Sequence, residues 1–312
     1  MDQDIIPTLI KQINQQNLSD NLFYLAKNPL LYRKLNYTVP GHSKNSLYET
    51  DDFIQAKLES WEYKVEKEGS KVQAFGRDIS KPKNQQYAPP PPDSPWYTAY
   101  DLYAKKKGDV SPDEIIMVIS HKDSQSWVNS PGAYDNAVGV VANIEIARIL
   151  KDYQSQHSIW FVFCNEEHTP WTSVSIAKNA KTRGDNFIAI LNLDALAGKS
   201  KEEETTGAKT NVTLYTTPEG EKIADLCSEV NSFYKIGLTQ RKYKRKAPGD
   251  DDGSFIKAGY PMAVANFGSY PYADPKYHDE GDIPERVNIQ NLRMTTQLIL
   301  AIIMKIDREG IK

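Results

Sequence analysis

Two adjacent glutamates, Glu166 and Glu167, follow a run of apolar residues in the stretch SIWFVFCNEEHTP, which begins at Ser158. The apolar run is typical of a strand that is buried on both faces of a sheet. Like charges side by side raise each other's pKa and destabilise the ionised forms, unless a cation lies between them. The pair therefore raises the question of whether the chain supplies further metal ligands.

Other carboxylate and imidazole side chains follow the remaining apolar runs of the sequence. In sheets with parallel strands, functional sites form at the carboxyl ends of the strands. Two histidines and four carboxylates occupy such positions: His121, Asp135, Glu166, Glu167, Asp194 and His278. Mixed imidazole and carboxylate ligation suits zinc, and a pair of metal ions needs at least one bridging carboxylate. The set predicts a zinc site at one edge of a sheet.

Each of these residues also has a simpler interpretation. Asp135 suits the N-cap position of a helix, because its side chain can accept a backbone N–H. A single histidine is more often an ordinary hydrogen-bonded residue than a metal ligand. The two glutamates are also compatible with a solvated strand end. The occurrence of all six residues at strand ends favours the metal site, since six independent accidents rarely coincide.

The elements that must position these residues alternate regularly after residue 110. Strands are predicted at 114–120, 158–164, 187–193, 211–216 and 261–267, and helices at 135–152, 171–182, 219–233 and 287–307. Apolar strands that alternate with helices indicate a mainly parallel sheet covered on both faces. The sequence thus predicts an α/β three-layer sandwich, in which helices flank a mixed, mainly parallel β-sheet.

The N-terminal part of the chain has a different pattern. Residues 1–65 read as mostly helical and amphipathic, and a short strand is predicted at 72–76. The stretch KPKNQQYAPPPPDSPW (81–96) must be a loop, because four consecutive prolines cannot join a helix or a central strand. The stretch after it, 98–108, reads as an edge strand and a turn. We expect one domain over 1–312, with a mainly helical part, 1–85, packed on the core.

Composition excludes several classes of protein. A net charge of −3 and a pI near 6.0 give no global field for nucleic acid or an anionic membrane. The longest apolar run, Leu298 to Met304, is far too short to span a bilayer. Two cysteines, Cys164 and Cys227, allow at most one disulfide, so the chain is no disulfide scaffold. The N-terminus has no apolar segment typical of a signal peptide.

The motifs around the candidate ligands also follow a known order. They are His121-x-Asp123, Gly132-Ala133-x-Asp135-Asn136-Ala137, Asn165-Glu166-Glu167, Asn192-Leu193-Asp194 and Tyr277-His278. Over residues 100–310 they resemble the M28 family of zinc peptidases, which contains the co-catalytic dizinc aminopeptidases. The resemblance implies a zinc-exopeptidase-like fold with two Zn²⁺ ions per chain. It assigns one ion to His121, Asp194 and a bridging Asp135, and the other to Glu167, His278 and the same Asp135.

The resemblance also implies roles for residues that do not bind metal. Glu166 would move the proton between the attacking water and the leaving amine. Asp123 would orient His121 through its far ring nitrogen, and Asp282 would do the same for His278. Asp251 matches the aspartate of a family Ser-Asp-His motif whose histidine is missing here. The loop after Glu167 lacks both glycines of the family pattern, so its shape is expected to differ.

Aromatic residues and one basic cluster complete the set of candidates. Tyr270, Tyr272 and Tyr277 occur in the loop that carries the second histidine, and we expect them to line a substrate pocket. The stretch RKYKRK (241–246) reads as a solvated loop. Its place close before the DDDGSF stretch also allows a role in attracting an acidic substrate.

Three functions compete at this point. The first is a dizinc aminopeptidase acting on a peptide or aminoacyl substrate. The second is a glutaminyl cyclase, an aminoacyltransferase on a similar fold that uses one zinc. The third is a catalytically inactive binding domain that has kept the fold. The Asp-Asn-Ala context of Asp135 resembles the peptidase. The resemblance also favours a secreted or periplasmic location, and the sequence leaves the oligomeric state open.

Overall fold

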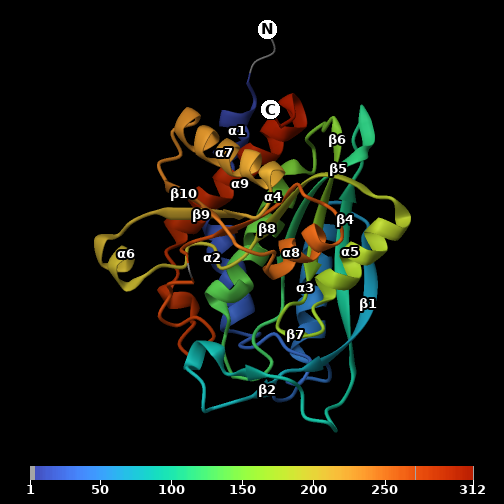
Figure 1. The fold of residues 1–312 in the computed structure, drawn as a ribbon, viewed down its shortest axis with the longest axis vertical. Helices are drawn as coiled ribbons and strands as arrows, with labels where there is room; N and C mark the ends of the chain where they lie inside the picture. The colour runs from blue at the N-terminus through green and yellow to red at the C-terminus, as the bar shows by residue number, and fades with distance from the viewer. Residues whose placement is uncertain (1–3, 271, 312) are drawn as a thin grey trace.

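A nine-stranded sheet with helices on both faces forms the centre of the molecule (Figure 1). The computed structural model describes residues 4–270 and 272–311. The sheet strands, in chain order, are β1 (Val65–Ala74), β4 (Tyr97–Lys106), β5 (Ser111–His121), β6 (His157–Cys164), β7 (His168–Thr169), β8 (Asn186–Leu193), β9 (Thr210–Tyr215), β10 (Thr239–Lys244) and β11 (Ala263–Phe267). A separate hairpin pairs β2 (Gly76–Arg77) with β3 (Tyr87–Ala88).

The sheet is mixed, with order β10-β9-β11-β8-β5-β6-β4-β1-β7. The four central neighbours, β11, β8, β5 and β6, pair in parallel. Antiparallel pairs flank them, since β9 joins β11 and β4 joins β6 in that sense. The prediction of a mixed sheet between helical layers is confirmed, and parallel pairing is concentrated in the centre of the sheet, where the candidate ligands are.

The central strands are apolar because both of their faces are covered. In β5, Ile116 and Val118 belong to one buried cluster, whereas Ile115, Met117 and Ile119 belong to another on the opposite face. Successive side chains of a strand point to opposite faces, so an unbroken apolar run fills both layers.

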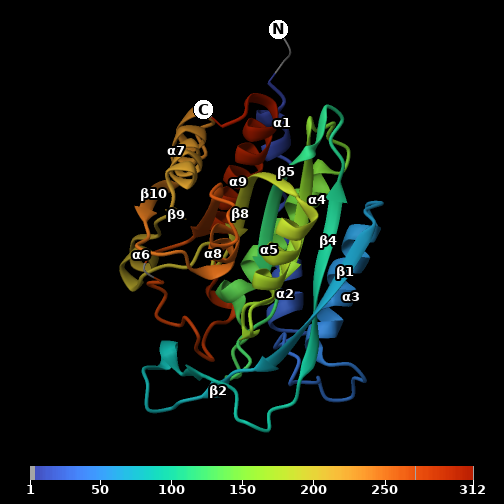
Figure 2. The ribbon, with the colours of Figure 1, turned by 45° about the vertical axis from the view of Figure 1, so that its right-hand side comes forward.

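The helices divide between the two faces of the sheet, as Figure 2 also shows. Their bounds are α1 (Ile6–Ile10), α2 (Gln15–Ala26), α3 (Ser46–Glu59), α4 (Val138–Leu150), α5 (Thr172–Arg183), α6 (Lys201–Thr206), α7 (Pro218–Phe233), α8 (Asp250–Lys257) and α9 (Ile289–Glu309). The first cluster joins the sheet to α1–α4, α7 and α9. The second joins it to α5 and α8. Among the described residues, no helix is long and apolar enough to cross a membrane.

Three local expectations are wrong. The strand predicted at 72–76 runs instead from Val65 to Ala74 and pairs with β4. As a result, β4 lies inside the sheet and is not an edge strand. The basic stretch 241–246 is no solvated loop, because residues up to Lys244 form β10 at the edge of the sheet. Both missed strands are rich in charged residues, and strands near a sheet edge need few apolar side chains.

The N-terminal helices share the core of the sheet. Leu18, Leu22 and Leu25 of α2 are fully buried in the same cluster as residues of α4 and α9. Arg33, which follows α2, is also fully buried, and its guanidinium donates to the carbonyl oxygens of Leu25, Lys122, Pro131 and Gly132. These contacts support the expectation of a single domain, which stays a prediction; residues 1–3, 271 and 312 lie outside the described part of the chain.

Candidate metal centre

The carboxyl ends of three central strands meet at one edge of the sheet. β5 ends at His121, which pairs in register with Cys164 at the end of β6. Glu166 and Glu167 follow that strand after one residue, Asn165, and Asp194 follows the last residue of β8. Parallel strands in register bring the residues beyond their carboxyl ends to the same place. This topology explains how residues far apart in the sequence share one site.

Asp135 reaches the same edge from the turn before α4. The side chain of Asn136 donates to the carbonyl oxygen of Leu193 (2.8 Å) and accepts from the backbone N–H of Gly139 (3.0 Å). A Cβ at position 139 would lie 2.3 Å from the Leu193 oxygen, so only glycine fits there. These contacts fix the turn against the end of β8. The helix starts later than predicted, and Asp135 is not its N-cap.

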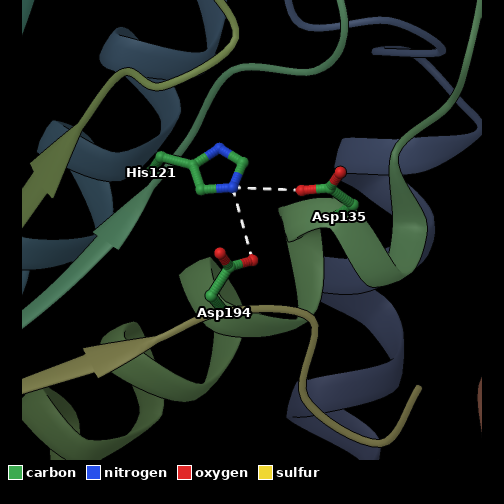
Figure 3. Close-up of side chains that lie close together, drawn as sticks. All are labelled: His121, Asp135 and Asp194. Atoms are coloured by element: carbon green, nitrogen blue, oxygen red, sulfur yellow. Dashed lines mark ion pairs between the residues drawn. The ribbon is translucent and has the colours of Figure 1, made fainter. Parts of the chain in front are cut away.

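Three candidate ligands form a first group, shown in Figure 3. His121 Nε2 lies 3.1 Å from Asp135 Oδ1 and 3.4 Å from Asp194 Oδ1. All three side chains are buried, with at most 8% of each exposed. One ligand atom from each residue lies within 4.8 Å of the others, a spacing that can enclose one metal ion.

A second group shares Asp135 with the first. His278 Nε2 lies 3.1 Å from Asp135 Oδ2 and 3.4 Å from Glu167 Oε1. Asp135 therefore directs one carboxylate oxygen toward each group. The structure brings all five residues to which the resemblance gave metal-binding roles into two adjacent sets with Asp135 in common.

The donor set fits metal ions of the zinc type. Each group offers one imidazole nitrogen and two carboxylates, the ligand types that zinc accepts. Within the described residues, Asp194 Oδ1 is buried without any hydrogen-bond partner. Burying a carboxylate oxygen without a donor is costly, so such an atom indicates that a cation completes the site.

The pKa values of the ligand groups in the metal-free protein also indicate a missing cation. Burial raises the pKa of Asp194 to about 7. Burial would also raise the pKa of Asp135, but hydrogen bonds from His121 and His278 outweigh it and lower that pKa. For His278, burial lowers the pKa, and the charge of Glu167 with a hydrogen bond to Asp135 raises it to about 10. Without a metal ion, the neighbouring carboxylates thus favour a proton on His278 at the position where an ion would otherwise balance their charge.

Asp123 lies behind His121. His121 Nδ1, the ring nitrogen that faces away from the ligand group, lies 3.2 Å from the backbone carbonyl oxygen of Asp123 and 3.3 Å from its Oδ1. The same carboxylate accepts the backbone N–H groups of Glu166 and Glu167, both at 2.9 Å, and faces His168 Nδ1 at 2.7 Å. Asp123 thus holds both the histidine and the turn that carries the paired glutamates.

Glu166 lies beside the first group but points at no hydrogen-bond donor. Its Oε2 is 4.0 Å from His121 Nε2 and, within the described residues, has no hydrogen-bond partner. Burial and the charges of Asp251 and Asp250 raise the pKa of Glu166 well above its usual range. A carboxyl group with a raised pKa holds a proton more strongly than an ordinary glutamate, which suits a group that accepts a proton from water.

The role expected for Asp282 is wrong. Its carboxylate accepts the backbone N–H groups of Tyr134 (2.9 Å) and Asp135 (3.1 Å). Asp282 therefore fixes the turn that carries Asp135. His278 Nδ1 lies instead 3.0 Å from the backbone carbonyl oxygen of Asn84. A carbonyl partner from a distant loop leaves no side-chain signal in the sequence. Asp251 is buried behind the site and accepts a hydrogen bond from Cys164 Sγ (3.0 Å).

Gln125 is a site residue that the sequence reasoning missed. Its Nε2 lies 2.8 Å from Asp135 Oδ2 and 3.1 Å from Glu167 Oε1. The side chain therefore contacts both carboxylates of the second group. It occurs in the loop QSWVNS, where no pattern marks it as different from other polar loop residues.

A cavity of about 400 Å³ opens onto both groups. Its aromatic lining comprises Phe75, Tyr87, Trp127, Trp171, Tyr272 and Tyr277. Tyr277 stacks on the His278 ring with centroids 3.8 Å apart. Two of the three expected pocket tyrosines, Tyr272 and Tyr277, thus line the cavity. Tyr270 is not one of the lining residues; its ring packs beside Tyr243 of β10, with centroids 5.1 Å apart.

One wall of the cavity comes from the segment around the β2–β3 hairpin, which lies at the end of the molecule opposite α1 (Figure 1). Phe75, Asn84, Gln85 and Tyr87 of this segment face the cavity. Lys83 Nζ anchors it by contacts with Asp279 (2.8 Å) and Glu280 (3.6 Å). The sequence predicted only a surface loop for most of this stretch, since long-range ion pairs cannot be read from one segment.

Known proteins resemble this chain in sequence and in fold. The profile of peptidase family M28 matches residues 101–303. A "probable zinc metalloprotease" of Pyrenophora tritici-repentis is 30% identical over 143 residues, which cover 44% of this chain and 32% of that protein. A "probable aminopeptidase" of Saccharomyces cerevisiae is 24% identical over 220 residues, 66% of this chain and 57% of that protein. The chain thus spans about a third to a little over half of the length of these relatives.

The fold also matches a solved structure over nearly its whole length. An aminopeptidase from Aneurinibacillus sp. strain AM-1 superposes with a TM-score of 0.71, covering 96% of this chain and 95% of that one. Sequence identity is 15%. At that level the likeness establishes the fold, including the part before residue 101 that the family profile does not reach.

Proposed function

The chain belongs to peptidase family M28, and from this premise we propose that it is a zinc-dependent aminopeptidase that releases N-terminal residues from peptides. The observation that carries the proposal is the pair of ligand groups joined by Asp135, with Glu166 beside them. Two metal positions with a shared carboxylate are typical of hydrolases that activate water.

The ligand roles derive from the two groups. We assign one zinc ion to His121, Asp135 and Asp194, and a second to Asp135, Glu167 and His278. Bound zinc supplies Lewis acidity, which polarises a carbonyl group and lowers the pKa of water toward 7. Asp123 and the Asn84 carbonyl oxygen hold the far nitrogens of the two histidines, so each ring presents Nε2 to its group.

Glu166 is assigned the proton transfers. It is buried, faces the first group, and is the only one of the paired glutamates that lies outside both ligand sets. In this role the carboxylate takes a proton from the attacking water and then delivers it to the leaving amine. A pKa raised above the usual carboxyl range makes the group a stronger proton acceptor.

A direct assay tests the proposed function. The zinc-loaded protein is expected to hydrolyse leucine p-nitroanilide and to leave the N-acetylated substrate intact, since an aminopeptidase requires a free amine. Removing zinc with a chelator should abolish turnover, and added zinc should restore it. Cyclisation of an N-terminal glutamine without hydrolysis of any aminoacyl substrate would instead identify a glutaminyl cyclase. Zinc-loaded protein with neither activity would leave only the binding-domain hypothesis.

A further inference from the structure

Five carboxylates line the cavity, and only four have been given a role. Asp135, Asp194 and Glu167 belong to the ligand groups, and Glu166 is the proton carrier. Among the described residues, Asp250 is the only other carboxylate in the cavity wall. It begins α8 and reaches the site from a part of the chain that supplies no metal ligand.

Asp250 is held rigidly with one oxygen left over. Its Oδ2 accepts hydrogen bonds from the Tyr272 hydroxyl (2.7 Å) and from Arg245 Nη1 (2.6 Å). Within the described residues, no hydrogen-bond donor contacts its Oδ1. The side chain lines the cavity and is 16% exposed, so a group bound in the cavity can reach the carboxylate. A charged donor inside the cavity would complete it.

The charge around Asp250 is not balanced by the protein. Arg245 is the cation that contacts it, and the same guanidinium also contacts Asp252. One positive charge thus faces two carboxylates. Asp252 is fully buried and its Oδ1 has no partner in the described part of the chain. When both carboxyl groups are ionised, a net negative charge remains beside the cavity wall, and a charge of that kind attracts a cation.

We propose that Asp250 receives the ammonium or guanidinium group of an N-terminal lysine or arginine side chain, so that the enzyme prefers substrates with a basic N-terminal residue. This inference rests on the proposed aminopeptidase function. It names a specificity-determining residue within the same cavity.

The side chain of the substrate fits this position better than its α-amine does. The α-amine is two covalent bonds from the carbonyl carbon under attack, so it must lie with Glu166 and the ligand groups. A lysine side chain extends farther, and its methylene groups can pack on Tyr272 and Tyr277, which stack with centroids 5.1 Å apart. Aromatic faces also attract the cationic end of such a side chain.

Matched substrates test the inference in the wild-type protein. Norleucine has nearly the aliphatic stem of lysine without the charge, so p-nitroanilides of lysine and norleucine differ mainly at the atoms that would meet Asp250. We expect kcat/KM for the lysine substrate to be about 10- to 100-fold higher, as for a hydrogen bond to a charged group. A ratio of one or less, with good hydrolysis of the norleucine and leucine substrates, would overturn the inference and leave the proposed function intact. No hydrolysis of any of the three would overturn both.

The variant Asp250→Asn tests whether Asp250 binds the side chain of the substrate or its α-amine. The amide keeps the size and the acceptor oxygen for Tyr272 but loses the charge. The lysine-to-norleucine ratio of kcat/KM should fall to near one. The ratio is compared because the charge of Asp250 also raises the pKa of Glu166, so its loss can change the turnover of both substrates together. A ratio that stays at the wild-type value would contradict the assignment. Calorimetric binding of free lysine against free norleucine to the wild-type protein gives a readout that does not depend on turnover, and equal affinities would contradict the inference too.

Discussion

Glu166 and Glu167 are neighbours in the chain but face different partners. Glu167 Oε1 lies 3.4 Å from His278 Nε2, within the second ligand group. Glu166 Oε2 lies beside His121 and outside both groups. Asp123 accepts both of their backbone N–H groups, which fixes the turn that separates the two side chains. One buried aspartate thus fixes the turn from which the two adjacent carboxyl side chains reach different partners.

Substitution of each glutamate by glutamine should separate these purposes. Glu166→Gln is expected to keep both metal ions, because the residue is in neither ligand group, and to lose kcat by about 10²–10⁴-fold. Glu167→Gln is expected to lower zinc affinity, since a neutral amide is a poor zinc ligand. Zinc content by atomic spectroscopy and kcat on leucine p-nitroanilide measure both effects. If Glu166→Gln sheds zinc and Glu167→Gln retains it, the two roles are reversed.

At the scale of elements, strand ends were the most predictable part of the site. The candidate ligands could be found in the sequence because an apolar run ends where a buried strand leaves the core, and parallel strands end together. The turn that holds Asp135 was less predictable, since its contacts with Leu193 arise only after folding. The sequence did not predict that Asp282 accepts the backbone N–H of Asp135, or that the Asn84 carbonyl oxygen contacts His278. Each contact involves a backbone group, which every residue type provides.

The two missed strands show another limit. β1 contains Glu66, Lys67, Glu68 and Lys71, and β10 contains mostly exposed basic residues. Such strands pair through backbone hydrogen bonds with a neighbouring strand. A local pattern of apolar residues therefore does not predict them. Arg241 of β10 pairs with Glu203 of α6, and Lys242 pairs with Glu221 and Asp225 of α7. Carboxylates of neighbouring helices therefore partly neutralise the basic cluster that suggested an acidic substrate.

The segment around the β2–β3 hairpin gives a prediction at this scale. Lys83→Glu should place like charges against Asp279 and Glu280 and loosen the segment, so that the Asn84 carbonyl oxygen no longer holds His278. We expect zinc affinity to fall by about 10-fold, as for other losses of a histidine's outer partner. Competition with a chelator measures the affinity.

Lys81→Glu is the matched control for this change. Lys81 lies in the same segment and has the same charge, but its carboxylate neighbour is Asp78 and not the loop at 279–280. Zinc affinity should stay within about twofold of wild type in this variant. An equal loss in both variants would show that surface charge, and not the contact with His278, is responsible.

At the scale of the whole molecule, buried side chains connect the N-terminal helices to the sheet edge that carries the candidate ligands. Arg33 bonds to the loops that flank His121 and Asp135, and burial lowers its own pKa to about 10. Lys122, next to the first ligand, contacts Asp51 of α3 at 3.0 Å. These buried cations connect the part before residue 65 to the site. The single-domain prediction therefore implies that heat unfolds the helices and the sheet in one transition.

The buried carboxyl groups predict how stability depends on pH in the zinc-free protein. Burial raises the pKa of Asp194, Asp252 and Asp282 from 3.8 to about 7. The folded state then binds more protons than the unfolded state between these values, so stability falls as pH rises through this window. His278, with its raised pKa of about 10, acts in the same direction above its ordinary value of 6.5.

Thermal unfolding of chelator-treated protein should therefore show Tm decreasing from about pH 5 to about pH 8. Zinc should raise Tm most at the upper end, because the ion replaces the protons on Asp194 and His278. A Tm that rises with pH over this range in the zinc-free protein would contradict the burial of these carboxyl groups.

The most direct test of the two-metal centre is anomalous X-ray scattering at the zinc absorption edge, measured on crystals of the zinc-loaded protein. Two peaks about 3.5–4 Å apart are expected, with Asp135 between them. Zinc–ligand distances of about 2.0–2.2 Å should join one peak to His121 and Asp194 and the other to Glu167 and His278. A single peak at full zinc loading, or a pair of peaks that Asp135 does not bridge, would contradict the account.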